Sequence, residues 1–166
     1  MKEDFDDIFN NEENSELVNR YEEMLKNNTQ YFFDVSEVES IIDYYMDSNK
    51  SNTAFHVVEI AAQQHPSSLN IQLKKAQVLL DKGHGLQALK VIEKVERIES
   101  SNSDVYLLKG TTLNVMGKYG EAVKAFDTAV IYSYEDKVDI IHTIAQSFEQ
   151  IGRYKTALRY FHEAYK

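Results

Sequence analysis

The side chains that could do chemistry in this sequence are five histidines, a closely spaced pair of glycines and many carboxylates. Two histidines four residues apart on one helix face are a common pair of metal ligands, but no two histidines here have that spacing. The sequence has no cysteine, which excludes disulfides, cysteine-ligated metals and cysteine nucleophiles. We therefore expect no metal site, and we interpret the histidines as ordinary helix and turn residues: His56, His65, His84, His142 and His162.

The two glycines of the segment DKGHGLQ, Gly83 and Gly85, have the spacing of part of a phosphate-binding loop. Such a loop follows a β-strand, whereas these glycines separate two segments whose apolar residues have helical spacing. No serine lies in the strand–turn–helix setting that exposes a nucleophile. Nothing in the sequence indicates that the carboxylates lie in a cleft, so we interpret them as solvated surface charges. We therefore expect no catalytic centre and no cofactor, and we expect that the protein is not an enzyme.

Composition indicates a soluble protein with a sizeable core. Of the 166 residues, 43% are apolar, which argues against disorder over most of the length. No apolar run approaches the roughly 18 residues of a membrane span, and the acidic start lacks the apolar segment of a secretory signal. We expect a cytoplasmic location.

Negative charge is concentrated near the N-terminus. The formal net charge is -9, and residues 1–34, with ten acids and three bases, account for -7 of it. Nucleic acids and anionic membranes bind basic patches, so we expect neither as a partner. We interpret residues 1–14 as an acidic, flexible end.

The rest of the chain shows a repeat. Its apolar residues recur with helical spacing, and one proline and six glycines leave few interruptions. Segments 75–95, 107–130 and 143–165 share a small residue, an apolar helix end, a glycine and then an alanine that precedes a large apolar residue by four positions. The aligned alanines are spaced by 34, 34 and 35 residues, which indicates an array of helix–turn–helix units: Ala54, Ala88, Ala122 and Ala157.

This pattern resembles the tetratricopeptide repeat (TPR). Units counted from Val35, Leu69, Ser103 and Val138 have alanine at position 20 four times. Position 8, where the two helices of a unit cross, is a small residue in three units, Ala76, Gly110 and Ala145, and Ile42 in the first. Position 15, in the turn, is glycine in three units, Gly83, Gly117 and Gly152, and Asn49 in the first. The resemblance implies an all-α, right-handed superhelical array of antiparallel helix pairs, an α-solenoid with units 35–68, 69–102, 103–137 and 138–166.

Both ends of the array have features of their own. Asp34 and Glu37 have the spacing of a capping box, and Phe33 and Val38 that of a hydrophobic staple. Residues 15–34 are predicted to be a capping helix and linker, because an apolar face recurs over 15–28 and terminal units need a cover. At the other end no further helix follows the last unit, so we expect an apolar face that this chain leaves partly uncovered: Tyr160, Phe161, Ala164 and Tyr165. Either the chain is a fragment of a longer array, or another copy of the chain covers this face.

In this family the first helices of the units line a concave groove, which implies a site for a peptide or protein segment. Positions 2, 5 and 9 of these helices have no lysine or arginine that could bind the C-terminal carboxylate of a chaperone, and the nearest base is Lys74. The resemblance therefore does not imply that this chain binds chaperone tails. Acidic ends and an apolar centre suit a peptide with apolar anchors and some basic residues. The candidate groove residues are Glu39, Asp43, Met46, Leu73, Gln77, Leu80, Leu107, Thr111, Asn114, His142, Gln146 and Glu149.

Two functions therefore remain open. The protein is either an adaptor or scaffold that binds a peptide or protein segment in the groove, or a self-assembly or architectural module. The second function uses the bare C-terminal face, through a homodimer or through further repeats. A third interpretation is that the groove binds nothing and is only the surface of a fragment. An enzyme or small-molecule sensor would need a pocket with convergent polar groups, which the sequence does not indicate.

Overall fold

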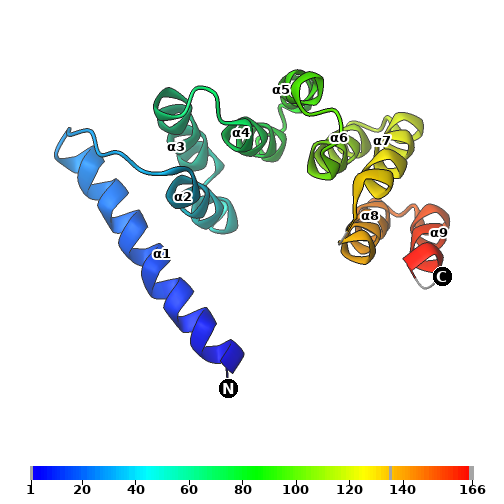
Figure 1. The fold of residues 1–166 in the computed structure, drawn as a ribbon, viewed down its shortest axis with the longest axis horizontal. Helices are drawn as coiled ribbons and strands as arrows, with labels where there is room; N and C mark the ends of the chain where they lie inside the picture. Colours follow the sequence, from blue (N-terminus) through cyan, green and yellow to red (C-terminus); the bar gives the residue numbers. More distant parts are fainter. Residues whose placement is uncertain (1, 135, 165–166) are drawn as a thin grey trace. The chain divides into compact units, whose positions relative to one another are not determined.

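The computed structural model describes residues 2–134 and 136–164, and within them every regular element is an α-helix (Figure 1). The chain divides into two compact units, one up to Lys82 and one from Gly83. The helices of the first are α1 (Lys2–Lys26), α2 (Val35–Asp47), α3 (Ser51–Gln64) and α4 (Leu69–Asp81). Those of the second are α5 (Gly85–Ile98), α6 (Ser103–Val115), α7 (Tyr119–Tyr132), α8 (Lys137–Gln150) and α9 (Tyr154–Ala164).

The helices from α2 to α9 form four successive pairs, which confirms the all-α repeat architecture. The pairs follow the predicted repeats, except that α8 begins at Lys137, one residue before the predicted unit 138–166. The division between the two units lies between α4 and α5, inside the predicted repeat 69–102. None of the described helices is long and apolar enough to cross a membrane.

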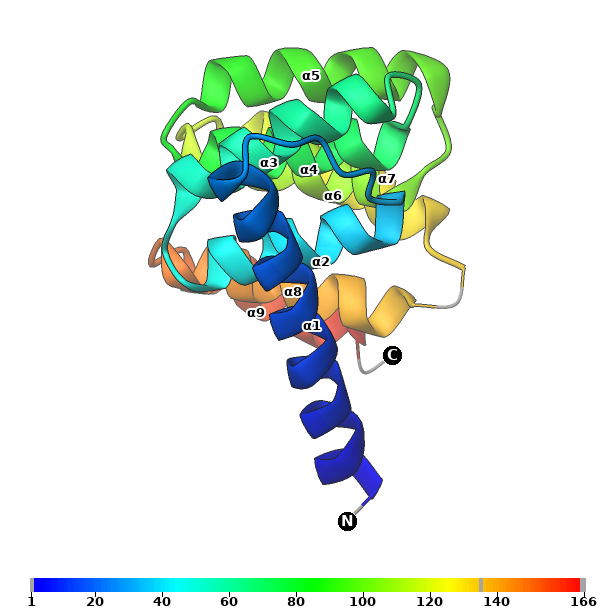
Figure 2. The ribbon, with the colours of Figure 1, turned by 90° about the vertical axis from the view of Figure 1, so that its left-hand side faces the viewer.

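The N-terminal helix is longer than the sequence analysis expected. α1 begins at Lys2, so it includes the acidic segment 1–14 from residue 2 onward, which we had separated from the capping helix as a flexible end. No proline or glycine interrupts residues 2–26, so nothing in that sequence forces a helix break. Figure 2 shows α1 running past α2, with its first turns extending beyond the other helices of the first unit.

The start of α2 confirms the predicted capping box. The Asp34 carboxylate accepts a hydrogen bond from the Glu37 backbone N–H (2.9 Å), and the Glu37 carboxylate accepts one from the Asp34 N–H (2.9 Å). The bonds from the Glu37 backbone and the Ser36 hydroxyl lower the pKa of Asp34. Phe33 and Val38 are both buried in the core of the first unit.

The turn between the two helices of each repeat is left-handed at position 15. Asn49 has φ 55°, and the three glycines at this position have φ between 74° and 78°. Only glycine adopts this conformation without strain, and asparagine tolerates it better than most residues. The predicted helix–turn–helix geometry therefore recurs in all four repeats: Asn49, Gly83, Gly117 and Gly152.

Small residues let the helices approach closely where the repeat pattern requires it. In the second unit Gly110 of α6 lies directly against the ring of Phe126 on α7, and a Cβ at this glycine would overlap the ring. The alanines of position 20 are all buried, at 3% exposure or less: Ala54, Ala88, Ala122 and Ala157. Close packing at these sites explains why positions 8 and 20 carry small residues.

The core of the first unit includes part of α1. Tyr21 and Met24 of α1 are buried, and the Tyr21 ring contacts the rings of Phe33 and Tyr45 (centroid distances 6.5 and 6.0 Å). α1 packs on α2 (Figure 2). The C-terminal half of α1 thus buries an apolar face, as the capping-helix prediction requires.

The linker between α1 and α2 is held by side chains rather than by a ladder of backbone bonds. The Gln64 side chain donates to the Tyr31 carbonyl (2.7 Å) and accepts from the Phe33 N–H (3.2 Å). His65 Nε2 donates to the Phe33 carbonyl (2.7 Å), and Arg20 donates to the Phe32 carbonyl (2.9 Å). Side chains from α1 and from the end of α3 therefore fix the path of residues 31–33.

The core of the second unit reaches its last helix. Tyr160 of α9 is fully buried, its ring stacks on Phe148 of α8 (centroids 5.8 Å apart, planes at 7°), and its hydroxyl donates to Asp127 of α7 (2.8 Å). The expectation that Tyr160 is partly bare is therefore wrong, because α8 and α7 cover it. Phe161 and Ala164 are half-buried, and Tyr165 lies outside the described residues.

Candidate functional site

In the first unit, six candidate groove residues lie on two first helices that pack against each other, α2 and α4. Within each helix the candidates are three or four residues apart, a spacing that puts them on one face. The structure leaves all six at least partly exposed. The α2 residues are Glu39, Asp43 and Met46, and the α4 residues are Leu73, Gln77 and Leu80.

The charge on this face differs from the expectation. The ammonium of Lys74 lies 2.6 Å and 2.8 Å from the two carboxylate oxygens of Asp43, so one of the two candidate acids already has a counter-ion. Glu39 has no ion pair with any described residue. Lys74 is the base nearest to the groove positions, and spacing along the sequence cannot reveal an ion pair that joins α4 to α2.

The apolar part of the same face is half-buried. Met46 packs against the core of the first unit, and Leu73 and Leu80 are also only partly covered. Half-buried apolar side chains lose little conformational entropy when a partner binds, because packing already restricts their rotamers. The face of α2 and α4 thus combines three half-buried apolar residues with one acid that has no counter-ion.

In the second unit, the other six candidates lie on α6 and α8, which also pack against each other. Leu107, Thr111 and Asn114 are on α6, and the Thr111 hydroxyl donates to the Leu107 carbonyl of its own helix (2.9 Å). Asn114 is only 2% exposed. Its amide donates to the Ser147 hydroxyl (2.9 Å) and carbonyl (3.2 Å) on α8, so Asn114 joins two helices and has almost no surface for a partner.

The α8 candidates are more accessible. Gln146 and Glu149 are exposed, and His142 is half-buried with its ring 5.8 Å from the ring of Phe161 on α9. Leu107 is half-buried against the core of this unit. Leu107, Thr111, His142, Gln146 and Glu149 therefore remain as surface candidates, whereas Asn114 does not.

The shifted pKa values belong to the buried tyrosines of the core, to the half-buried Tyr106 of α6 and to the helix-cap residue Asp34. Burial raises the pKa of Tyr21 to about 12, and burial together with a carboxylate partner raises those of Tyr45 and Tyr160. Among the described residues, no three histidine or carboxylate side chains are grouped so that they could hold a metal ion.

Comparisons with known proteins identify the fold. No protein-family model and no curated protein sequence matches this chain. A thermophilic TPR protein from Thermus thermophilus is similar in structure, with a TM-score of 0.68 and 20% sequence identity over 89% of this chain and 79% of the other.

Structures of MamA are also similar. One has a TM-score of 0.62 and 17% identity over 89% of this chain and 84% of that chain. MamA from Desulfovibrio magneticus RS-1 has a TM-score of 0.59 and 18% identity over 79% of this chain and 73% of that chain. These likenesses agree with the succession of helix pairs, and the chain has a TPR-like helical-repeat fold.

Proposed function

We propose that this protein is an interaction scaffold that binds a peptide or protein segment on the exposed faces of its first helices. The observation that carries this proposal is the pairing of first helices within each unit, α2 with α4 and α6 with α8. Each pair presents half-buried apolar residues among polar ones. Such a face supplies apolar contact area, while its polar groups set the direction of a bound segment.

The first unit supports a preference for basic peptides with aliphatic side chains. Glu39 lacks a counter-ion among the described residues, and the apolar residues Met46, Leu73 and Leu80 belong to the same two helices. A lysine or arginine of the ligand would pair with Glu39, and aliphatic residues would cover the apolar positions. An acidic peptide would meet uncompensated repulsion.

Selection from a displayed random peptide library, with the full chain as bait, tests this proposal. Enriched peptides should combine aliphatic and basic residues. Glu39→Lys should weaken their binding by about fivefold, a typical effect for a partly exposed charge pair. Glu23→Lys makes the same charge change at an exposed position of α1 and should leave the affinity unchanged. Equal affinities of wild type and Glu39→Lys would exclude the face of α2 and α4.

Self-assembly is the second candidate function, and exposed apolar residues at the end of the second unit favour it. Tyr154 and Leu158 of α9 are 68% and 57% exposed, and Ile151 lies just before that helix. Sedimentation velocity over a wide concentration range should show a dimer that Leu158→Glu dissociates. A monomer at every concentration would exclude this candidate.

We also propose that the protein is cytoplasmic and has no enzymatic activity. The formal net charge of -9 disfavours nucleic acid and anionic membranes as partners. Fractionation of the source cells would test the location directly.

A further inference from the structure

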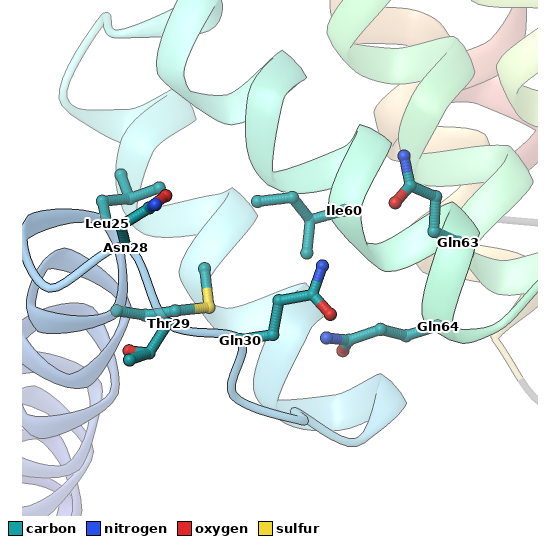
Figure 3. Close-up of a pocket in the computed structure, with 8 residues that line it drawn as sticks. Leu25, Asn28, Thr29, Gln30, Ile60, Gln63 and Gln64 are labelled. Carbon is teal, nitrogen blue, oxygen red and sulfur yellow. The ribbon is translucent and has the colours of Figure 1, made fainter.

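A separate pocket in the first unit is built from elements other than α2 and α4. It has a volume of about 400 Å³ and lies between the end of α1, the following linker and α3 (Figure 3). Pockets that hold small ligands are typically about 300–1,000 Å³. The residues that line it, named here the amide pocket, are Met24, Leu25, Asn28, Thr29, Gln30, Ile60, Gln63 and Gln64.

The lining of the amide pocket has one apolar part and one amide-rich part, and none of its eight side chains is charged. Met24, Leu25 and Ile60 supply the apolar part, and Leu25 is 45% exposed. Four side-chain amides offer both donors and acceptors: Asn28, Gln30, Gln63 and Gln64. An ionised ligand would lose its water here without meeting an opposite charge, so the lining favours an uncharged one.

Gln64 shows what kind of group these amides recognise. Its amide donates to the Tyr31 carbonyl and accepts from the Phe33 N–H, so it binds two groups on one edge of an irregular, extended segment. Gln63 precedes it on α3 and is exposed, as is Gln30 in the linker. Figure 3 shows the Gln30 amide beside that of Gln64, with Ile60 and Gln63 on the α3 side.

The wall of the pocket opposite α3 has a defined geometry. The Asn28 N–H donates to the Leu25 carbonyl (3.3 Å), and the Thr29 N–H donates to the Met24 carbonyl (3.1 Å). With Asn28 at φ 50°, these bonds form the closing motif of a helix C-terminus. This motif fixes where Asn28 and Thr29 stand relative to the apolar residues of α1.

We propose that the amide pocket binds an uncharged, extended peptide segment that carries an aliphatic side chain. The aliphatic group covers Leu25 and Ile60, and the backbone amides of the segment pair with Gln63, Gln30 and Asn28. The amide pocket shares no residue with the faces of the first helices. An experiment that contradicts one of the two proposals therefore does not contradict the other.

Nitrogen-15 NMR titration of the full chain with three leucine derivatives tests this inference. N-acetyl-leucine-N-methylamide is uncharged, N-acetyl-leucine is anionic and leucine-N-methylamide is cationic, while all three carry the same side chain. The uncharged probe should shift the side-chain amide signals of Asn28, Gln30 and Gln63 and bind at least about fivefold more tightly than either charged probe. Equal binding of the three probes, or shifts elsewhere only, would overturn the proposal.

A matched pair of variants completes the test. Gln63→Ala removes one exposed amide of the pocket and should weaken binding of the uncharged probe about fivefold, the usual effect of one hydrogen bond. Gln87→Ala makes the same change at an exposed position of α5 and should bind as wild type does. Equal affinities of the two variants, with both folded by circular dichroism, would also overturn the proposal.

Discussion

The ammonium of Lys74 on α4 lies 2.6 Å from one carboxylate oxygen of Asp43 on α2 and 2.8 Å from the other. This ion pair joins the first helices of two successive repeats at a half-exposed position. A surface pair of this kind contributes about 0–1 kcal/mol to folding and weakens with salt. Its larger effect is on the charge that the face of α2 and α4 presents to a partner.

Removing the lysine should therefore strengthen the binding of basic peptides. In Lys74→Ala, Asp43 loses its counter-ion and joins Glu39 as a second free acid. Peptides selected on the wild type should bind this variant about fivefold more tightly, as measured by calorimetry at low salt. The double variant Lys74→Ala/Asp43→Asn should return to the wild-type affinity, and a single variant that binds no more tightly would contradict this prediction.

The crossing of α6 and α7 makes a second prediction. Gly110→Ala should lower the free energy of unfolding by about 1–3 kcal/mol, the usual cost of overpacking, because the new methyl group would overlap the Phe126 ring. Gly120→Ala in α7 is the control, since a Cβ there meets nothing within 4 Å. That control should be neutral or stabilising by about 0.5–1 kcal/mol. Urea unfolding curves that show the same loss for both would exclude the packing explanation.

The repeat was predictable from sequence because its requirements are local. Position 15 needs a left-handed backbone, and Asn49, the one non-glycine there, has φ 55° like its glycine counterparts. Position 17 is tyrosine in the last two units but Gly85 in the second, and this difference has a spatial reason: a Cβ at Gly85 would lie 2.9 Å from the Met116 side chain. Sequence spacing indicates such a departure but not the neighbour that causes it.

The features that the sequence analysis missed are contacts between residues about thirty positions apart, such as Asn114 with Ser147. Helical spacing places Asn114 among the groove positions, but it cannot show that α8 covers this residue. The same limit applies to Tyr160, whose cover consists of Phe148 and Asp127. The amide pocket was not predicted either, because Gln30 and Gln63 come to line one pocket only when α3 lies beside the linker.

The turn residues make a third prediction. Gly117→Ala should destabilise the protein by about 1–2 kcal/mol, because alanine resists the left-handed conformation that Gly117 adopts at φ 77°. Asn49→Gly should be neutral or slightly stabilising, since glycine accepts the same φ without strain. Thermal unfolding of both variants would check this. A Gly117→Ala protein as stable as the wild type would show that the turn can relax.

The linker makes a fourth prediction, which separates stability from binding at two adjacent residues. Gln64→Ala removes both bonds to the backbone of Tyr31 and Phe33 and should cost about 1–3 kcal/mol of stability, the penalty for part-buried groups left unpaired. Gln63→Ala should leave the free energy of unfolding within about 0.5 kcal/mol of wild type, because Gln63 is exposed. Chemical denaturation would measure both, and a Gln64→Ala variant as stable as Gln63→Ala would refute the role of Gln64 in the linker.

The buried hydroxyl of Tyr21 makes the last prediction, which concerns alkaline pH. This hydroxyl has no hydrogen-bond partner among the described residues, and burial raises the pKa of Tyr21 to about 12. An unfolded tyrosine loses its proton near pH 10, so between about pH 10 and 12 the folded state binds more protons than the unfolded state. Stability from this group is therefore complete below about pH 10 and decreases as the pH rises through that window.

Tyr21→Phe should remove part of this alkaline loss and should keep the ring contacts with Phe33 and Tyr45. At neutral pH the variant should be as stable as the wild type or more stable by about 1 kcal/mol, because an unsatisfied buried hydroxyl is gone. Tyr134→Phe, at a side chain that is 88% exposed, is the control and should unfold like the wild type at every pH. Urea unfolding at neutral pH and at about pH 11 measures both, and a clear loss of stability in Tyr21→Phe at neutral pH would mean that the hydroxyl has a partner in the folded protein.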